Sequence, residues 1–145
     1  MLRREALMDN PDPALLALVP LFKGLTPDQL QRLSSWFEVK HFNSGSSPVK
    51  AGSHGYAFFV LSKGRVRVER DGQILEQLEP GAVFGEMAFF APNSRRNAAV
   101  VAETPVQVFT MFGTHFREMQ TEMPEVAARL EQLFEERAAN HRQDS

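Results

Sequence analysis

The chain has 145 residues, about the size of one domain, and its 43% hydrophobic and 23% charged residues are typical of a folded soluble protein. A net charge of -2 without a basic cluster argues against nucleic-acid or membrane-surface binding. The absence of cysteine excludes disulfides, thiolate nucleophiles and sulfur-based metal sites. With no membrane-length apolar run and no cleavable leader, we expect a cytoplasmic protein without membrane insertion.

Helix signals come first along the chain. Asp12 before Pro13 is typical of a helix N-cap and first helical position. Thr26 and Gln29 have the spacing of a capping box, which predicts a helix from about Pro27 to Phe37. The apolar residues of this second helix recur at helical spacing at Leu30, Leu33, Trp36 and Phe37.

Short strands separated by turns follow the two helices. Residues 57–61 form an apolar run typical of a buried strand, and Val66 and Val68 alternate with polar residues as in a half-exposed strand. Asp71-Gly72 predicts a hairpin between this strand and residues 73–78. Further strands are predicted at 98–101 and 106–111. So many short strands favour a barrel or jelly roll.

The chain is predicted to be helical again from Thr114, with a last helix that starts at Pro124. Its apolar stripe, which either folds back on the chain or forms a homodimer, comprises Val126, Leu130, Leu133 and Phe134. Arg129 and Arg137 are expected on the solvent-exposed faces of this helix.

We therefore predict one α+β domain over residues 1–145, a β-barrel or jelly roll of the double-stranded β-helix type flanked by N- and C-terminal helices. The expected parts are N-terminal helices at 12–38, the barrel at 39–112 and C-terminal helices at 113–142.

One segment between the predicted strands combines a carboxylate with two arginines. Gly85 permits a sharp turn, and Glu86 begins a stretch that can form one or two helical turns. Exposed N–H groups at the start of such a stretch attract an anion. Arg95 and Arg96 return toward it, and a guanidinium holds phosphate oxygens with paired donors. This arrangement suits a ligand that carries both hydroxyls and a phosphate.

The same segment resembles the phosphate-binding cassette of cyclic nucleotide-binding domains. Phe84-Gly85-Glu86-Met87-Ala88 and Arg96-Asn97-Ala98-Ala99-Val100 stand in the places of that family's two motifs, and Glu86 and Arg96 are ten positions apart. Residues 19–25, 59–66 and 78–81 are also similar to family segments, so the resemblance covers about 15–134 and the cassette spans 84–100.

The resemblance implies a role for each matching residue. Gly85 and Glu86 would hold the ribose 2′-hydroxyl, and Arg96 would pair with the cyclic phosphate. The same resemblance implies supporting roles for other residues. The backbone N–H groups of Ala88 and Asn97 would lie beside the phosphate, and Ala98 would belong to the binding segment. Leu75 and Met87 would line the base pocket, and Leu130 or Phe134 of the last helix would close over the base as a lid.

Some residues leave alternatives open. Arg95 takes the phosphate role if the loop shifts by one position, and Met87 is equally well explained as a core residue. Asn97 and Ala99 stand where family members often carry Ser or Thr, which bears on base preference. The four histidines, His41, His54, His115 and His141, are scattered, so no metal site is predicted.

The resemblance implies a stand-alone regulatory module, not an enzyme, that binds cAMP or cGMP as its ligand and needs no other cofactor. cAMP is favoured only because it is the commoner ligand in the family. Binding would be transmitted by movement of the C-terminal helix to an unidentified protein partner. With no recognition helix in the sequence, direct nucleic-acid binding is not expected. The alternatives are a ligand-free barrel acting as a protein adapter, or the sensor part of a larger transcription factor, channel or kinase.

Overall fold

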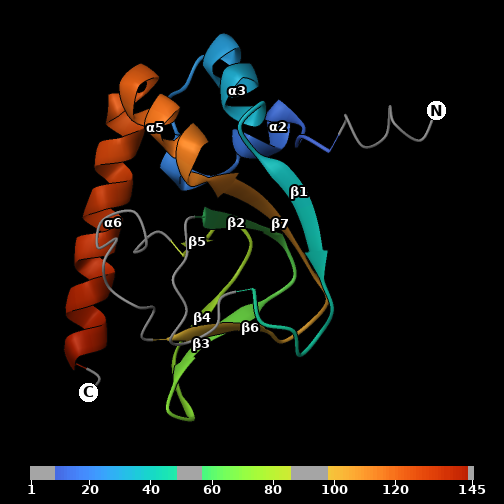
Figure 1. Ribbon diagram of the computed structural model, residues 1–145, viewed down its shortest axis with the longest axis vertical. Coiled ribbons are helices and arrows are strands. Elements are labelled where there is room, and N and C mark those ends of the chain that lie inside the picture. The colour runs from blue at the N-terminus through green and yellow to red at the C-terminus, as the bar shows by residue number, and fades with distance from the viewer. Residues whose placement is uncertain (1–8, 49–56, 86–97, 144–145) are drawn as a thin grey trace.

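The computed structural model describes residues 9–48, 57–85 and 98–143 (Figure 1). The shorter helices gather at one end of the molecule and the strands at the other, while the last helix runs along both (Figure 1). In chain order the elements are α2 (Pro13–Leu16), η1 (Pro20–Phe22), α3 (Pro27–Ser34), β1 (Glu38–Phe42), β2 (Ala57–Lys63), β3 (Val66–Arg70), β4 (Gln73–Leu78), β5 (Val83–Phe84), β6 (Ala99–Ala102), β7 (Val106–Phe112), α5 (Gly113–Glu122) and α6 (Pro124–Gln143).

The described strands form two antiparallel sheets. One has the order β1-β7-β2-β5 and the other the order β4-β3-β6. The two sheets with their flanking helices confirm the predicted α+β, jelly-roll-like fold.

The core has two parts, one on each face of the first sheet. Strand β2 shows the division, because its successive side chains point to opposite faces. Phe58 and Val60 pack among the helices, in what we call the helical cluster, together with Phe37, Phe109 and Leu130. On the other face, Phe59, Leu61, Val66, Phe84, Val100 and Val108 belong to what we call the barrel cluster, between the two sheets. The barrel cluster thus includes Phe84 of β5, the strand that leads into the predicted cassette.

The local turn and cap predictions are confirmed. Thr26 Oγ1 accepts from the backbone N–H of Gln29 at 3.1 Å, and the Gln29 side chain accepts from the N–H of Thr26 at 2.9 Å. Asp71 and Gly72 both have positive φ, at 53° and 79°, as a two-residue type I′ hairpin requires. Here the chemistry that sets the conformation lies within a few residues of the turn.

The end of α3 differs from its prediction. The helix ends at Ser34 and not at Phe37, and the residues that follow form tighter i→i+3 hydrogen bonds, from the N–H of Trp36 to the carbonyl of Leu33 and from the N–H of Phe37 to that of Ser34. The amide Nδ2 of Asn10 donates to the carbonyl of Phe37 at 2.8 Å and to that of Ser34 at 3.3 Å. Trp36 and Phe37 are buried as predicted, but from a turn that leads into β1.

Helix α6 packs back on its own chain. Val126 and Leu130 are fully buried in the helical cluster, while Leu133 and Phe134 are half-buried. The apolar stripe therefore serves intramolecular packing in this structure. Within residues 9–48, 57–85 and 98–143, no helix combines the length and the apolar character needed to cross a bilayer.

Candidate functional site

The structure describes part of the predicted site. Glu86, Met87, Ala88, Arg95, Arg96 and Asn97 lie outside the described residues, so their roles remain predictions. Gly85, Ala98, Leu75, Leu130 and Phe134 are described and can be placed.

Gly85 stands where the chain leaves the first sheet. Phe84 pairs with Phe59 of β2, and the next residue, Gly85, has a φ of 83°. An L side chain rarely adopts this left-handed conformation, whereas glycine does so without steric cost. The predicted sharp turn before Glu86 is therefore present.

Leu75 and Ala98 come from either side of β3. Leu75 lies in β4 at an irregularity where Val68 pairs with Glu76 but Glu69 pairs with Ile74, so it is the extra residue of a β-bulge. Ala98 immediately precedes β6. Both residues are partly buried against the barrel cluster. The fold thus brings these two predicted ligand residues to the cluster that also contains Phe84, next to Gly85.

The two lid candidates differ in their surroundings. Leu130 is fully buried in the helical cluster, away from the barrel cluster. Its side chain is committed to packing here, so the structure does not place it as a lid. Phe134, one turn further along α6, is half-buried and keeps the lid role as a prediction.

Sequence reasoning expected Arg129 and Arg137 on solvent-exposed faces of α6. Arg129 is exposed as predicted and Arg137 is partly buried, and the contacts of both guanidinium groups were missed. Arg129 Nη1 donates to the backbone carbonyls of Leu21 at 3.0 Å and Lys23 at 2.7 Å. Arg137 Nη1 donates to the carbonyl of Val83 at 2.7 Å. The sequence signal that could have revealed these contacts is a spacing of four residues, which puts Arg129, Leu133 and Arg137 on one face of the helix.

Arg137 joins α6 to both strands that flank the predicted base pocket. Besides its bond to Val83 of β5, its Nε lies 3.4 Å from Oε1 of Glu76 in β4, next to Leu75. The Arg137 side chain is only 11% exposed, so both contacts are largely shielded from solvent. We call this set of contacts from Arg137 to Val83 and Glu76 the α6 latch.

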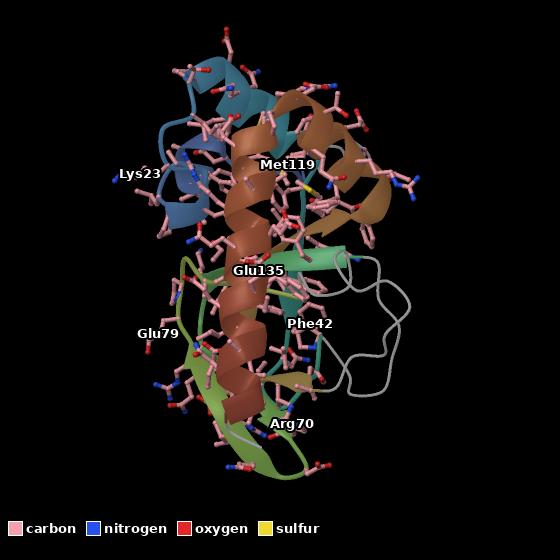
Figure 2. The ribbon with its side chains drawn as sticks, turned by 90° about the vertical axis from the view of Figure 1, so that its left-hand side faces the viewer. Lys23, Phe42, Arg70, Glu79, Met119 and Glu135 are labelled. Atoms are coloured by element: carbon pink, nitrogen blue, oxygen red, sulfur yellow. The ribbon has the colours of Figure 1, made fainter. Side chains whose placement is uncertain are left out.

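A cavity of about 320 Å³, partly open to solvent, lies between α6, η1 and the turn before β5. Its lining combines apolar side chains and backbone with the two arginines: Pro20, Leu21, Gly81, Ala82, Val83, Arg129, Leu133 and Arg137. Figure 2, which looks onto α6, shows the helix lying over the strands, with Glu135 on the helix and Glu79 on the loop after β4. Arg137 therefore holds the helix beside β5 and Arg129 holds it beside residues 21–23, across a space that close packing does not fill.

A metal centre has no support in the part of the chain that the structure describes. Residues 9–48, 57–85 and 98–143 contain no group of three or more His, Asp or Glu side chains close enough to hold a metal ion.

Two antiparallel sheets with flanking helices, one of which is held to β5 and β4 by Arg137, define an α+β, jelly-roll-like domain. The family described as "Cyclic nucleotide-binding domain" matches residues 39–122. The chain belongs to this family, as the cassette motifs predicted.

The relatives include both kinases and bacterial receptors. Human "cGMP-dependent protein kinase 2" is 32% identical over 94 residues, which cover 61% of this chain and 12% of the kinase. The "Cyclic AMP receptor protein" of Thermus thermophilus is 30% identical over 81% of this chain and 56% of the receptor. The crystal structure of the Thermus thermophilus catabolite activator protein has a TM-score of 0.76 and 28% identity, over 86% of this chain and 61% of that one. The chain thus spans only part of the length of these relatives.

Proposed function

We propose that this chain binds a cyclic nucleotide, cAMP in preference to cGMP, and acts as a regulatory sensor. The observation that carries the proposal is that Leu75 and Ala98, two residues assigned to the site, pack against the barrel cluster, which also contains Phe84, the residue before Gly85. In the sequence, Gly85 and Ala98 border the segment that carries Glu86 and Arg96. Family membership supports the same ligand class.

The proposed chemistry divides the ligand between two charged side chains. Glu86 accepts a hydrogen bond from the ribose 2′-hydroxyl, and Arg96 pairs with the cyclic phosphate through its forked donors. Leu75 contributes apolar contact to the base. The role is binding without catalysis, and the proposal includes no cofactor or metal besides the nucleotide.

The preference for cAMP rests on the frequency of that ligand in the family. The named relatives include a cGMP-dependent kinase and a cyclic AMP receptor, so they support the class of ligand and not the base. Asn97 and Ala99 stand where family members often have Ser or Thr. These are the positions at which the base preference of this chain would differ from that of other family members.

Transmission of binding is proposed to run through α6. Val83, whose carbonyl accepts from Arg137, is three positions before Glu86, so a shift of the cassette displaces an anchor of the helix. A ligand moves such an equilibrium only if it binds one helix arrangement better than the other. The cavity beside Val83 provides space for α6 to change its packing. The output is proposed to be a contact with a protein partner in the cytoplasm. Homodimerisation through α6 remains a prediction that light scattering on the purified chain would test.

Titration calorimetry with cAMP, cGMP and AMP tests the ligand. A ligand of about 22 heavy atoms, at about −0.3 kcal/mol per atom, gives a Kd in the micromolar range. We expect Glu86→Ala and Arg96→Ala each to weaken binding at least tenfold, because each leaves a charged or polar ligand group without its partner.

Arg95→Ala is the matched control, since it removes the same charge one position away. A tenfold loss in Arg95→Ala with none in Arg96→Ala would reassign the phosphate contact. Wild-type protein that binds neither cyclic nucleotide at millimolar concentration would reject the proposed function and favour the adapter alternative.

A further inference from the structure

A buried hydroxyl lies inside the barrel. Among the side chains that the structure describes, Oγ1 of Thr110 is the buried oxygen for which no hydrogen-bond partner is found. Thr110 belongs to β7 and is 1% exposed. Buried hydroxyl groups in native proteins nearly always have a partner, because removing them from water without one is unfavourable.

The strand alternation shows which way this hydroxyl points. Val106 and Val108 of β7 belong to the barrel cluster, whereas Phe109 and Met111 belong to the helical cluster. Thr110 is two residues after Val108 in the same strand, so its side chain points to the same face of the sheet, into the space between the two sheets. A valine has nearly the same shape and would fill this position without a polar atom. The hydroxyl therefore brings a capacity to hydrogen-bond that packing does not need.

Strand pairing connects Thr110 to the predicted cassette. Thr110 pairs with Phe59 of β2, and Phe59 pairs with Phe84 of β5, so the three residues form one row across the sheet. The rings of Phe59 and Phe84 stack with centroids 5.0 Å apart on the same interior face. Two strand spacings put Thr110 about 10 Å from Phe84, the residue before Gly85. A nucleotide held against Gly85 can span this separation.

We propose that the Thr110 hydroxyl donates a hydrogen bond to an oxygen of the sugar–phosphate part of the bound nucleotide. This inference rests on the proposed function. The sugar–phosphate part is favoured over the base because Thr110 lies in the sheet that leads to Gly85, whereas Leu75, assigned to the base, lies in the opposite sheet. Thr110 would thus be a ligand-contacting residue that does not distinguish one base from another.

Two substitutions at this position separate the hydroxyl from the methyl group. Thr110→Val replaces the hydroxyl by a methyl group of similar size, and we expect it to weaken cAMP and cGMP binding by the same factor, about five- to tenfold. The same variant removes an unpartnered polar atom from the ligand-free core, so its Tm should rise by about 2–4 °C. Thr110→Ser keeps the hydroxyl but loses a buried methyl, and should retain wild-type affinity with a lower Tm. Thr114→Val, at an exposed position in α5, is the control for which no change in affinity is expected.

Calorimetry and thermal unfolding of the full chain test whether the Thr110 hydroxyl contacts the nucleotide. Weaker binding together with a higher Tm in Thr110→Val supports the proposal, because substitution of a purely structural residue does not change affinity and Tm in these opposite directions. Wild-type affinity in Thr110→Val, a lower Tm for that variant, equal losses in the Val and Ser variants, or an effect on one nucleotide only would overturn it. If Arg96→Ala loses binding while Thr110→Val does not, the Thr110 contact alone fails. If the wild-type chain binds no cyclic nucleotide, the proposed function fails and this inference fails with it.

Discussion

Replacing Arg137 by alanine should detach the end of α6 from the barrel. The substitution removes the 2.7 Å hydrogen bond to the Val83 carbonyl and the 3.4 Å contact with the Glu76 carboxylate. The Arg137 side chain is 11% exposed, so water replaces these contacts poorly. The aliphatic part of the side chain also lines the cavity beside β5, so truncation enlarges that cavity.

The expected loss of stability follows from these contacts. A hydrogen bond from a charged donor contributes about 1.5–3 kcal/mol. The ion pair with Glu76 adds less than about 1 kcal/mol, because that carboxylate is about one-third exposed. We therefore expect Arg137→Ala to lower the free energy of unfolding by about 2–3 kcal/mol and Tm by about 5–10 °C.

Urea denaturation of the ligand-free chain measures this loss, and amide hydrogen exchange locates it. Exchange should accelerate in the turns of α6 after Leu133, while amides near Leu130, buried in the helical cluster, should stay protected. Arg137→Met keeps much of the aliphatic stem and should recover part of the packing but not the hydrogen bond. Arg117→Ala, on the exposed face of α5, is the control.

A change below about 0.5 kcal/mol in both Arg137 variants, with unaltered exchange in α6, would refute the reasoning, since that is the ordinary range for surface substitutions. A loss confined to Arg137→Ala would assign the effect to cavity filling and not to the hydrogen bond.

Acid and ligand provide two further perturbations. The hydrogen bond from Arg32 lowers the pKa of Glu122 from its ordinary value of 4.5, so the stability that this pair gives is present above that pH and is lost as the pH falls. In urea denaturation below about pH 4.5, Glu122→Gln should show a flatter decline than wild type or the exposed control Glu125→Gln, and parallel declines would contradict the link. Because the chain has no cysteine, Glu79→Cys with Glu135→Cys provides a unique pair of spin-label sites for testing whether α6 moves. Saturating cAMP should shift the distance distribution between the two labels, and an unchanged distribution would argue against transmission through α6.

Features whose chemistry is local were predictable from the sequence. The Thr26 capping box and the Asp71-Gly72 hairpin depend on neighbours within three residues, and both are present. The cassette motif likewise located the turn at Gly85, because a positive φ after a strand strongly favours glycine.

Features that depend on distant backbone were not predictable. At the early end of α3, the Asn10 amide binds the carbonyls of Ser34 and Phe37, and no pattern within the helix reveals that amide. Helical periodicity correctly predicted that Arg129 is exposed, but a helical pattern cannot show that a long cationic side chain, such as that of Arg129 or Arg137, reaches a carbonyl on another part of the chain. Among these long-range contacts, the one from Arg137 to Val83 is the one through which we propose that α6 responds to the site.

The arginines of α6 bind main-chain oxygens of η1 and β5, in addition to the Glu76 side chain. Every amino acid supplies such an oxygen, so replacing the side chain at Lys23 or Val83 leaves the acceptor itself in place. A sub-ångström displacement of the backbone, in contrast, lengthens the bond directly. We therefore expect the position of α6 to depend more on where the backbone of β5 lies than on which side chains β5 carries.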